Sequence, residues 1–227
     1  MDVKLSFCCL IFFSSFVSIG YSICNNIEDI SSDFLLARTN KQTSFYTDDT
    51  RFLKSTQTVG CPILSDSCLD TYSKKLKKST EVIINKTKIN GLYCSNKIYN
   101  TNDSGFISSN DLIIVSNQNY NSDLLIGNWI DSYGVSKLTV SKKNNLLHFI
   151  GNSVWYGLVD ENNERITHEG TFESNIVIPK INLFFTYDYS TDCLIKFNFV
   201  NNKYLVLNDN SNCGGMNVRF NGIYHKI

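Results

Sequence analysis

The stretch CLIKFNFV-NN-KYLVL, residues 193–207, decides the fold class of this 227-residue chain. Two runs rich in apolar and aromatic residues, Cys193–Val200 and Lys203–Leu207, flank the pair Asn201-Asn202. Asparagine tolerates a positive φ, which the two-residue turns of β-hairpins require. The stretch therefore predicts two antiparallel strands joined by a tight turn.

Similar runs continue from Trp129 to the C-terminus and are separated by polar turns. Their spacing of about 8–12 residues is typical of antiparallel barrels and sandwiches. We expect an antiparallel meander β-barrel or sandwich of about eight strands over residues 124–227. The expected strands are Lys137–Val140, Leu146–Ile150, Ser153–Val159, Arg165–Phe172, Ile176–Tyr187, Cys193–Val200, Lys203–Leu207 and Asn217–Tyr224.

Shorter runs upstream indicate a second β domain over residues 43–120. Short strands between polar turns favour a small barrel, and the polar segment Ser116–Asp123 is the expected linker. Both halves are therefore predicted to be all-β, and each has the length of a small domain. The expected strands are Ser44–Tyr46, Thr80–Ile84, Gly91–Ile98, Phe106-Ile107 and Leu112–Val115.

Residues 1–22 have the pattern of a secretory signal peptide. Lys4 precedes the apolar run Leu5–Ile19, and Gly20-Tyr21-Ser22 offers a cleavage site. The run is shorter than the about 20 residues of a membrane span, although an uncleaved anchor is the alternative. No second run of that length follows, so we expect a periplasmic or secreted mature chain without a membrane span. Residues 23–42 are expected to form a leader, either one short helix or an ordered segment.

Six of the eight cysteines remain after the signal peptide, and an even number in an exported chain predicts disulfides. Cys193 and Cys213 are the expected pair of the second half. Their bond would close a loop and stabilise the folded protein by about 3 kcal/mol. Cys61 with Cys68 would close a short loop and leave Cys24 with Cys94. The alternative is a zinc site, but the chain has no CxxC, and its three histidines stand far from the cysteines. We expect no metal.

The first half resembles a bacterial SH3-type domain. The resemblance rests on Thr80–Asn85, Gly91–Cys94 and Gly105-Phe106-Ile107 followed by Leu112, with Phe106 standing where the family carries a tryptophan. It implies a small barrel and an aromatic groove that binds a peptide. Candidate groove residues are Tyr46, Phe52, Tyr93 and Tyr99.

The second half resembles an uncharacterised bacterial periplasmic module that often follows such SH3-like domains. The similarity lies in Gly127-Asn128-Trp129, in Gly151–Trp155 and in the closing run Leu205–Tyr224, and it implies no activity. Trp129 is the expected core aromatic. Trp155 and Tyr156 are neighbours on a strand and point to opposite faces. One of the pair is therefore expected to face outward as a binding residue.

Catalytic motifs are missing from the sequence. It has neither a Gly-x-Ser-x-Gly elbow nor a phosphate-binding Gly-Lys loop, and paired cysteines are poor nucleophiles. The carboxylates of residues 160–164 lie in a polar segment that is typical of an exposed hairpin loop. The oxygen-rich loop Asn208–Gly215 could hold calcium, but it lacks EF-hand spacing and favours a turn. We expect no enzyme activity and no cofactor.

The balance of basic and acidic residues limits the classes of partner that we expect. The chain has 21 basic and 21 acidic residues, which argues against nucleic acid as the partner. The local basic run Lys74–Lys78 reads as a solvated turn. We expect an exported, non-catalytic cell-envelope binding protein whose SH3-like half engages peptidoglycan peptide or a protein tail. The alternative is an inhibitor or immunity protein against an envelope-attacking hydrolase such as a lysozyme.

Overall fold

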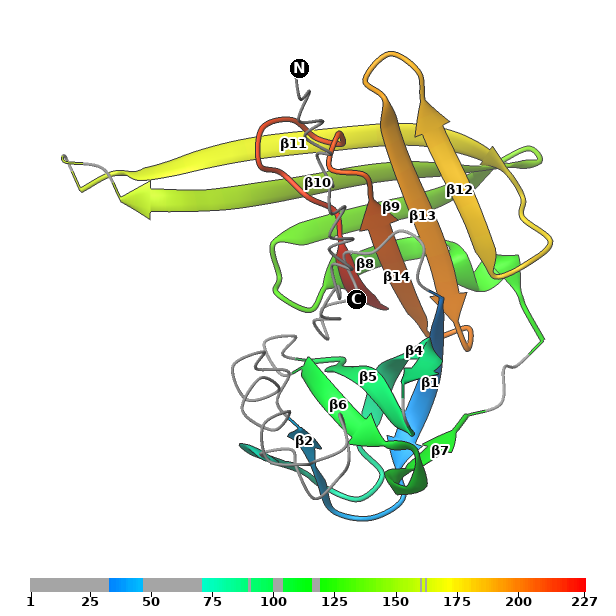
Figure 1. The fold of residues 1–227 in the computed structure, drawn as a ribbon. Helices are drawn as coiled ribbons and strands as arrows, with labels where there is room; N and C mark the ends of the chain where they lie inside the picture. The colour runs from blue at the N-terminus through cyan, green and yellow to red at the C-terminus, as the bar shows by residue number, and fades with distance from the viewer. Residues whose placement is uncertain are drawn as a thin grey trace, which may run out of the picture.

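The protein is all-β and consists of two antiparallel sheets (Figure 1). A computed structural model describes residues 33–46, 71–89, 91–99, 104–115, 119–159, 161 and 163–227. The expected signal peptide, Cys24, Cys61 and Cys68 lie outside these residues. No helix in the described part is both long enough and apolar enough to cross a membrane.

The first sheet contains seven strands in the order β3-β2-β6-β5-β4-β1-β7. Its core is a buried cluster that includes Phe45, Val82 and Ile107. A short 3-10 turn, η2 (Ser109–Asp111), joins the last two strands. The strands are β1 (Phe34–Thr39), β2 (Thr43–Tyr46), β3 (Thr71–Leu76), β4 (Glu81–Ile89), β5 (Leu92–Lys97), β6 (Ser104–Ser108) and β7 (Leu112–Ile114).

The second sheet contains eight strands in the order β11-β10-β9-β8-β15-β14-β13-β12 and curls into a nearly closed barrel. The 3-10 turn η3 (Ser122–Leu125) leads into it. The strands are β8 (Gly127–Asp131), β9 (Ser136–Lys143), β10 (Leu146–Val159), β11 (Arg165–Val177), β12 (Leu183–Asp188), β13 (Cys193–Val200), β14 (Tyr204–Asp209) and β15 (Gly222–Lys226). The predicted barrel of about eight strands is confirmed.

The β13–β14 hairpin forms as its sequence predicts. Asn201 and Asn202 both adopt positive φ, 53° and 56°, as tight hairpin turns favour. Val200 pairs with Tyr204, so the turn also includes Lys203, which was expected to begin the second strand. The strands read as continuous apolar runs because both of their faces are buried. Leu205 and Leu207 point into the barrel core, whereas Tyr204 and Val206 point outward and pack against the first sheet.

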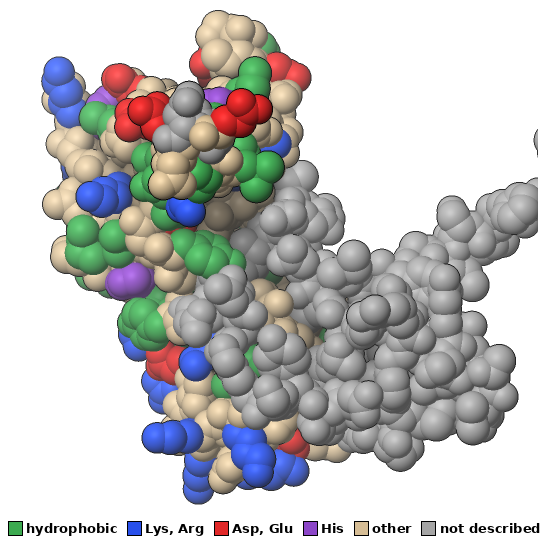
Figure 2. Space-filling view, turned by 90° about the vertical axis from the view of Figure 1, so that its left-hand side faces the viewer, with side chains coloured by type: hydrophobic (Ala, Val, Ile, Leu, Met, Phe, Trp, Pro, Cys, Tyr) green, Lys and Arg blue, Asp and Glu red, His purple; other side chains and the backbone are tan. Residues whose placement is uncertain are grey.

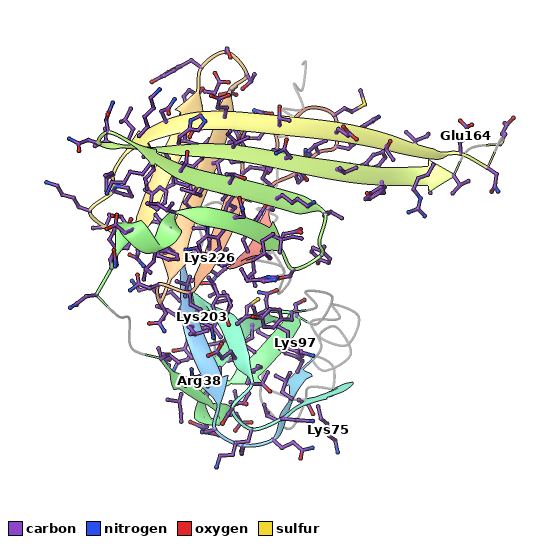
Figure 3. The ribbon with its side chains drawn as sticks, turned by 180° about the vertical axis from the view of Figure 1, so that it is seen from behind. Arg38, Lys75, Lys97, Glu164, Lys203 and Lys226 are labelled. Atoms are coloured by element: carbon purple, nitrogen blue, oxygen red, sulfur yellow. A yellow bond between two sulfur atoms is a disulfide. The ribbon has the colours of Figure 1, made fainter. Side chains whose placement is uncertain are left out.

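The two halves share a buried interface. Phe34, Leu36 and Ile83 of the first sheet form one cluster with Val206 and Ile223 of the barrel. Figure 3 shows Arg38 and Lys203, which come from different halves, on either side of this junction. Both contact Glu81, at 2.7 and 2.8 Å. A second ion pair joins the buried ammonium of Lys196 to Asp33 at 3.0 Å.

The predicted disulfide between Cys193 and Cys213 is confirmed, with a Cα–Cα distance of 4.8 Å. It ties the start of β13 to the loop between β14 and β15. Cys94 is also disulfide-bonded, and its predicted partner, Cys24, lies outside the described residues. The proposed Cys61–Cys68 pair lies there as well.

Several expected boundaries differ from the structure. Residues 34–39 of the expected leader form β1 instead of a helix, because the backbone of this segment pairs with β4 on one side and β7 on the other and most of its side chains are buried. The separate strands expected at 146–150 and 153–159 are one strand, β10. The strand expected from Ile176 to Tyr187 is interrupted, since β11 ends at Val177 and β12 begins at Leu183. Lys74 and Lys75 of the basic run lie in β3, and its turn begins only after Leu76.

Candidate functional site

The tyrosines predicted to line a groove in the first half contact different parts of the molecule. Tyr93 on β5 is half-buried and packs against the core of its own sheet. Tyr99 is exposed and its ring meets the His225 ring of the barrel edge-on at 5.1 Å. Tyr46 lies on β2, and its side chain, like the whole of Phe52, is outside the described part of the chain. The described side chains of Tyr93 and Tyr99 therefore do not line one groove together.

The tryptophans divide as the sequence predicts. Trp129 is buried in the barrel core, where its Nε1 donates a hydrogen bond of 2.8 Å to the Leu125 carbonyl. Trp155 is half-buried, packs against the same core and stacks on His168 with ring centroids 5.0 Å apart. Its neighbour Tyr156 faces outward and is 52% exposed. Tyr156 is thus the outward aromatic of the pair.

The hairpin of β10 and β11 extends beyond the rest of the barrel (Figure 1). The pairing of β10 with β9 stops at Ser153, opposite Ser136. From there to Val159, β11 is the one described strand that pairs with β10. We call residues 154–159 and 165–169 the arm. Its base is held by Trp155 and by His168, whose Nδ1 lies 2.9 Å from the Met216 carbonyl oxygen.

Large apolar side chains gather on the outer part of the arm. Leu158 is 84% exposed, and Val159 and Ile166 are each 49% exposed. Together with Tyr156 they form what we call the arm surface. Tyr156 pairs with Thr167, so Ile166 lies on the other face of the two-stranded arm, and the exposed apolar side chains occupy both faces. Large exposed apolar residues gathered in one place mark an interaction site more often than singly scattered residues do.

Charged residues surround the arm surface. Glu161 and Glu164 are exposed in the turn between the two strands, and Figure 3 shows Glu164 at the far end of the hairpin. The Arg165 guanidinium lies 5.9 Å from the centre of the Tyr156 ring. Figure 2, which faces the tip of the arm, shows hydrophobic side chains beside acidic ones. The arm therefore presents an apolar surface with an acidic tip.

Two buried aspartates of the barrel organise turns. Asp131 accepts hydrogen bonds from the backbone N–H groups of Val135 and Ser136, at 2.8 and 3.0 Å. Asp209 accepts from the N–H groups of Ser211 and Phe220, at 2.6 and 2.5 Å. Burial raises the pKa of both carboxyls, although these hydrogen bonds act in the opposite direction. Asp209 belongs to the Asn208–Gly215 loop, and its oxygens serve the predicted turn.

Sequence reasoning missed Leu158, Val159 and Ile166 as surface residues. Apolar residues that flank a polar hairpin loop look the same whether they face a core or the solvent. The structural reason for their exposure is strand length, since β10 has 14 residues and its partner β9 has 8. Beyond the end of its pairing with β9, β10 is paired on one side, with β11.

No family model, curated protein or solved structure matches this chain.

Proposed function

We propose that the chain is an exported, non-catalytic binding protein of the cell envelope that holds a protein partner through the arm surface. The single observation that carries the proposal is the projection of Tyr156, Leu158, Val159 and Ile166 beyond the barrel. A two-stranded hairpin without further support is only marginally stable in water. Its apolar side chains become favourable contacts when a partner removes them from water.

Export is supported by the cysteines. The Cys193–Cys213 bond and the bonded state of Cys94 fit an oxidising compartment. The signal-peptide pattern of residues 1–22 points to the same compartment. Both features support the periplasm or the cell exterior as the place where the arm meets its partner.

An envelope-attacking hydrolase such as a lysozyme is the first candidate partner. Paired strands lie about 4.8 Å apart, so the arm is a narrow ribbon that fits an open substrate cleft. Glu161 and Glu164 at its tip would favour a cleft lined by basic side chains. The rigid, disulfide-tied barrel beneath the arm lowers the entropy cost of presenting it.

Peptidoglycan binding through the SH3-like half is the second candidate. It rests on the SH3-type resemblance and on Tyr99, which is 57% exposed at the edge of that half. The two candidates use different surfaces, so variants of the arm distinguish them.

The test is a pull-down with the oxidised protein from Ile23 onward against a periplasmic extract, a panel of purified lysozymes and isolated sacculi. The double variant Leu158→Ser/Ile166→Ser should weaken capture of the protein partner about tenfold or more, because buried apolar anchors dominate interface energies. Both residues are exposed, so the stability of the free protein should change by less than about 0.5 kcal/mol.

The matched control is Val177→Ser. Val177 is 71% exposed at the opposite end of β11, and this variant should capture the partner as the wild type does. Equal capture by the arm variant would remove the arm from the proposal. Retention on sacculi without any protein partner would favour the SH3-like half. Slower hydrolysis by a captured lysozyme would identify the protein as an inhibitor.

A further inference from the structure

The barrel has one seam, between β11 and β12, the two end strands of the sheet. Within the described part of the chain, β11 pairs only with β10 and β12 only with β13. One end of the seam is closed by the disulfide loop, where Gly170 and Gly214 touch so closely that a Cβ on Gly170 would lie 2.0 Å from the Gly214 oxygen. The other end is closed by the connection of residues 178–182.

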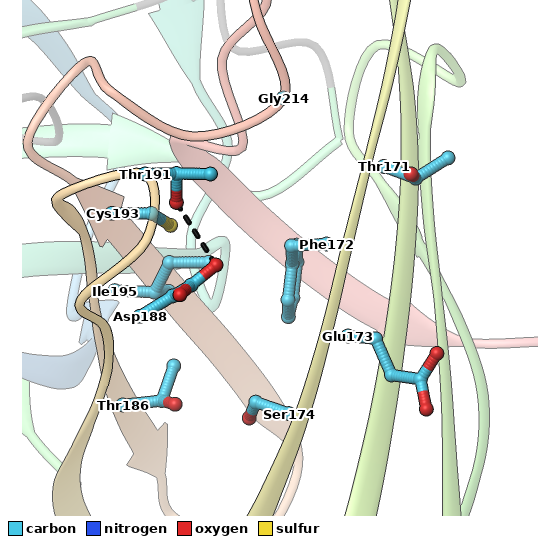
Figure 4. A pocket seen from close by; sticks show the side chains of 10 residues that line it. All are labelled: Thr171, Phe172, Glu173, Ser174, Thr186, Asp188, Thr191, Cys193, Ile195 and Gly214. Carbon is cyan, nitrogen blue, oxygen red and sulfur yellow. Dashed lines mark hydrogen bonds between the residues drawn. The ribbon is translucent and has the colours of Figure 1, made fainter.

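Between these closures lies a cavity of about 220 Å³ (Figure 4). Phe172 and Ile195 form apolar walls, and the Cys193–Cys213 bond lies at one end. Ligand pockets for drug-sized molecules measure about 300–1,000 Å³. This cavity therefore suits a single side chain or a small molecule.

One carboxylate faces the cavity. Asp188 points toward the Phe172 ring in Figure 4, whereas Glu173 on the neighbouring strand points away. Ser190 donates two hydrogen bonds to Asp188, at 2.7 and 2.9 Å, and Thr191 donates a third at 3.0 Å. These bonds hold the pKa of Asp188 below its ordinary value. No described residue that lines the cavity is Lys, Arg or His, so the carboxylate has no cationic side chain beside it there.

A hydroxyl in the cavity also lacks a partner. The Oγ atom of Ser174 is buried and forms no hydrogen bond, whereas most buried polar atoms in folded proteins have a partner. Thr186 on β12 supplies a second hydroxyl to the lining, across the seam from Ser174 on β11. The cavity thus offers hydrogen-bond acceptors beside one negative charge and an aromatic wall.

We propose that this seam cavity binds an alkylammonium group, with Asp188 accepting from the ammonium, Phe172 packing against the methylenes and Ser174 offering a further acceptor on the other side of the seam. An ammonium has three donors and no acceptor, which matches a site of acceptors with one negative charge. The proposal is independent of the arm surface, because it uses other residues on another part of the barrel.

Two sources could supply the group. One is a lysine side chain of an extended peptide, because the free edges of β11 and β12 offer backbone groups to which a peptide strand can pair. The other is a free diamine, which would use the cavity alone. The test contains both.

The two ammonium probes are Nα-acetyl-lysine methylamide and cadaverine. The two uncharged probes are the analogue Nα-acetyl-norleucine methylamide and the sugar N-acetylglucosamine. Each is titrated into the oxidised protein at low salt and followed by heteronuclear NMR. At least one of the two ammonium probes should bind about tenfold or more tightly than the norleucine amide, since a charge-assisted hydrogen bond is lost with the ammonium. Tighter binding of the lysine amide than of cadaverine assigns the peptide source, and the reverse assigns the free amine.

Three variants locate the binding. Asp188→Asn should weaken ammonium binding about tenfold while its side-chain oxygen still accepts from the Ser190 N–H, so the turn is kept. Ser174→Ala breaks no hydrogen bond of the free protein, so any loss of affinity reports a contact with the ligand. Glu173→Gln removes the same charge from a side chain that points away, and it should bind as the wild type does.

Several results would overturn the proposal. These are equal binding of the norleucine amide, binding of N-acetylglucosamine alone, unchanged affinity in a folded Asp188→Asn variant, or no shift of seam resonances with either ammonium probe.

Discussion

Glu81 is a residue at which the two halves meet through several polar contacts. Its carboxylate accepts from Arg38 and from Lys203, and also from the Tyr204 hydroxyl at 2.6 Å. Burial alone would raise the pKa of Glu81, but hydrogen bonds from Lys203, Tyr204 and Arg38 outweigh burial and lower it from 4.5 to about 2. The pKa of Tyr204 is raised, mainly because the hydroxyl is buried and further because it lies beside the Glu81 carboxylate.

The stability of the protein should therefore depend on Glu81 in acid. Because the pKa of Glu81 is depressed in the folded state, its contribution is complete above about pH 4.5 and is lost as the pH falls toward 2. Glu81→Gln should lower the free energy of unfolding by about 1–2 kcal/mol at pH 7, a range reduced by solvent around Arg38 and Lys203. Urea unfolding between pH 7 and 2 measures this.

The pH dependence of this difference tests whether the charge of Glu81 is its cause. In Glu81→Gln the difference from the wild type should shrink as the pH drops below about 4, because protonation removes the same charge from the wild type. The exposed Glu169→Gln variant is the control and should follow the wild type. A constant difference at every pH would contradict the role of the Glu81 charge.

Individual side chains differ in how far the sequence predicts them. The Cys193–Cys213 bond and the opposite faces of Trp155 and Tyr156 follow from local spacing, because neither depends on what packs above the strand. The positions of Tyr93 and Tyr99 depend on tertiary neighbours, one on the sheet core and one on His225 of the other half. Spacing along the chain carries no information about such contacts.

At the scale of elements, Gly151 explains why β10 is one strand where two were expected. Glycine often marks a break, but here it lies directly opposite Phe172 in the β10–β11 pair. A Cβ on Gly151 would lie 2.0 Å from the Phe172 ring. The missing side chain makes room for the ring, so this glycine serves cross-strand packing and not a turn.

Gly151→Ala should consequently destabilise the barrel. On the core side the ring of Phe172 is held by Phe220 and Phe197, whose ring centres lie 4.7 and 6.4 Å away, so a new Cβ would force it toward the seam cavity and out of these contacts. We expect a loss of about 1–3 kcal/mol, the usual cost of overpacking a core, measured as a shift of the urea midpoint. Asn152→Ala, at the exposed neighbouring position, should shift it much less. An unchanged midpoint in Gly151→Ala would show that the ring has room to move.

At the scale of the whole molecule, the outer face of β14 belongs to a core shared by both halves. Composition and turn spacing predict two β domains with a linker, and the structure has two sheets. The shared cluster was not predicted, although the continuous apolar run of β13 and β14 is its trace in the sequence. Such a run shows that a strand is covered on both faces, but it does not say by what.

The two halves should unfold as one cooperative unit. Val206 is fully buried in the shared cluster, so Val206→Ala should destabilise both halves together, by about 2 kcal/mol. Both tryptophans lie in the second half, so their fluorescence follows the barrel, whereas far-UV circular dichroism follows both sheets. The two signals should give one coincident transition in the wild type and in the variant.

Separate transitions would contradict this cooperativity and would mean that the interface forms after each half has folded. Val177→Ala is the control for the substitution itself. Its side chain is exposed, and the midpoint should stay within the error of the wild type.

The overhang of the arm also affects how fast its backbone amides exchange with solvent. In the body of the barrel β10 is bonded on both sides, to β9 and to β11, so its amides exchange with solvent only through rare, large openings. Beyond Ser153 each strand has one neighbour, and fraying from the turn suffices to expose its N–H groups. Deuterium uptake should therefore quicken step by step from Trp155 toward Val159 along β10. A partner that seats on the arm would slow that uptake while leaving the barrel's exchange rates as they were.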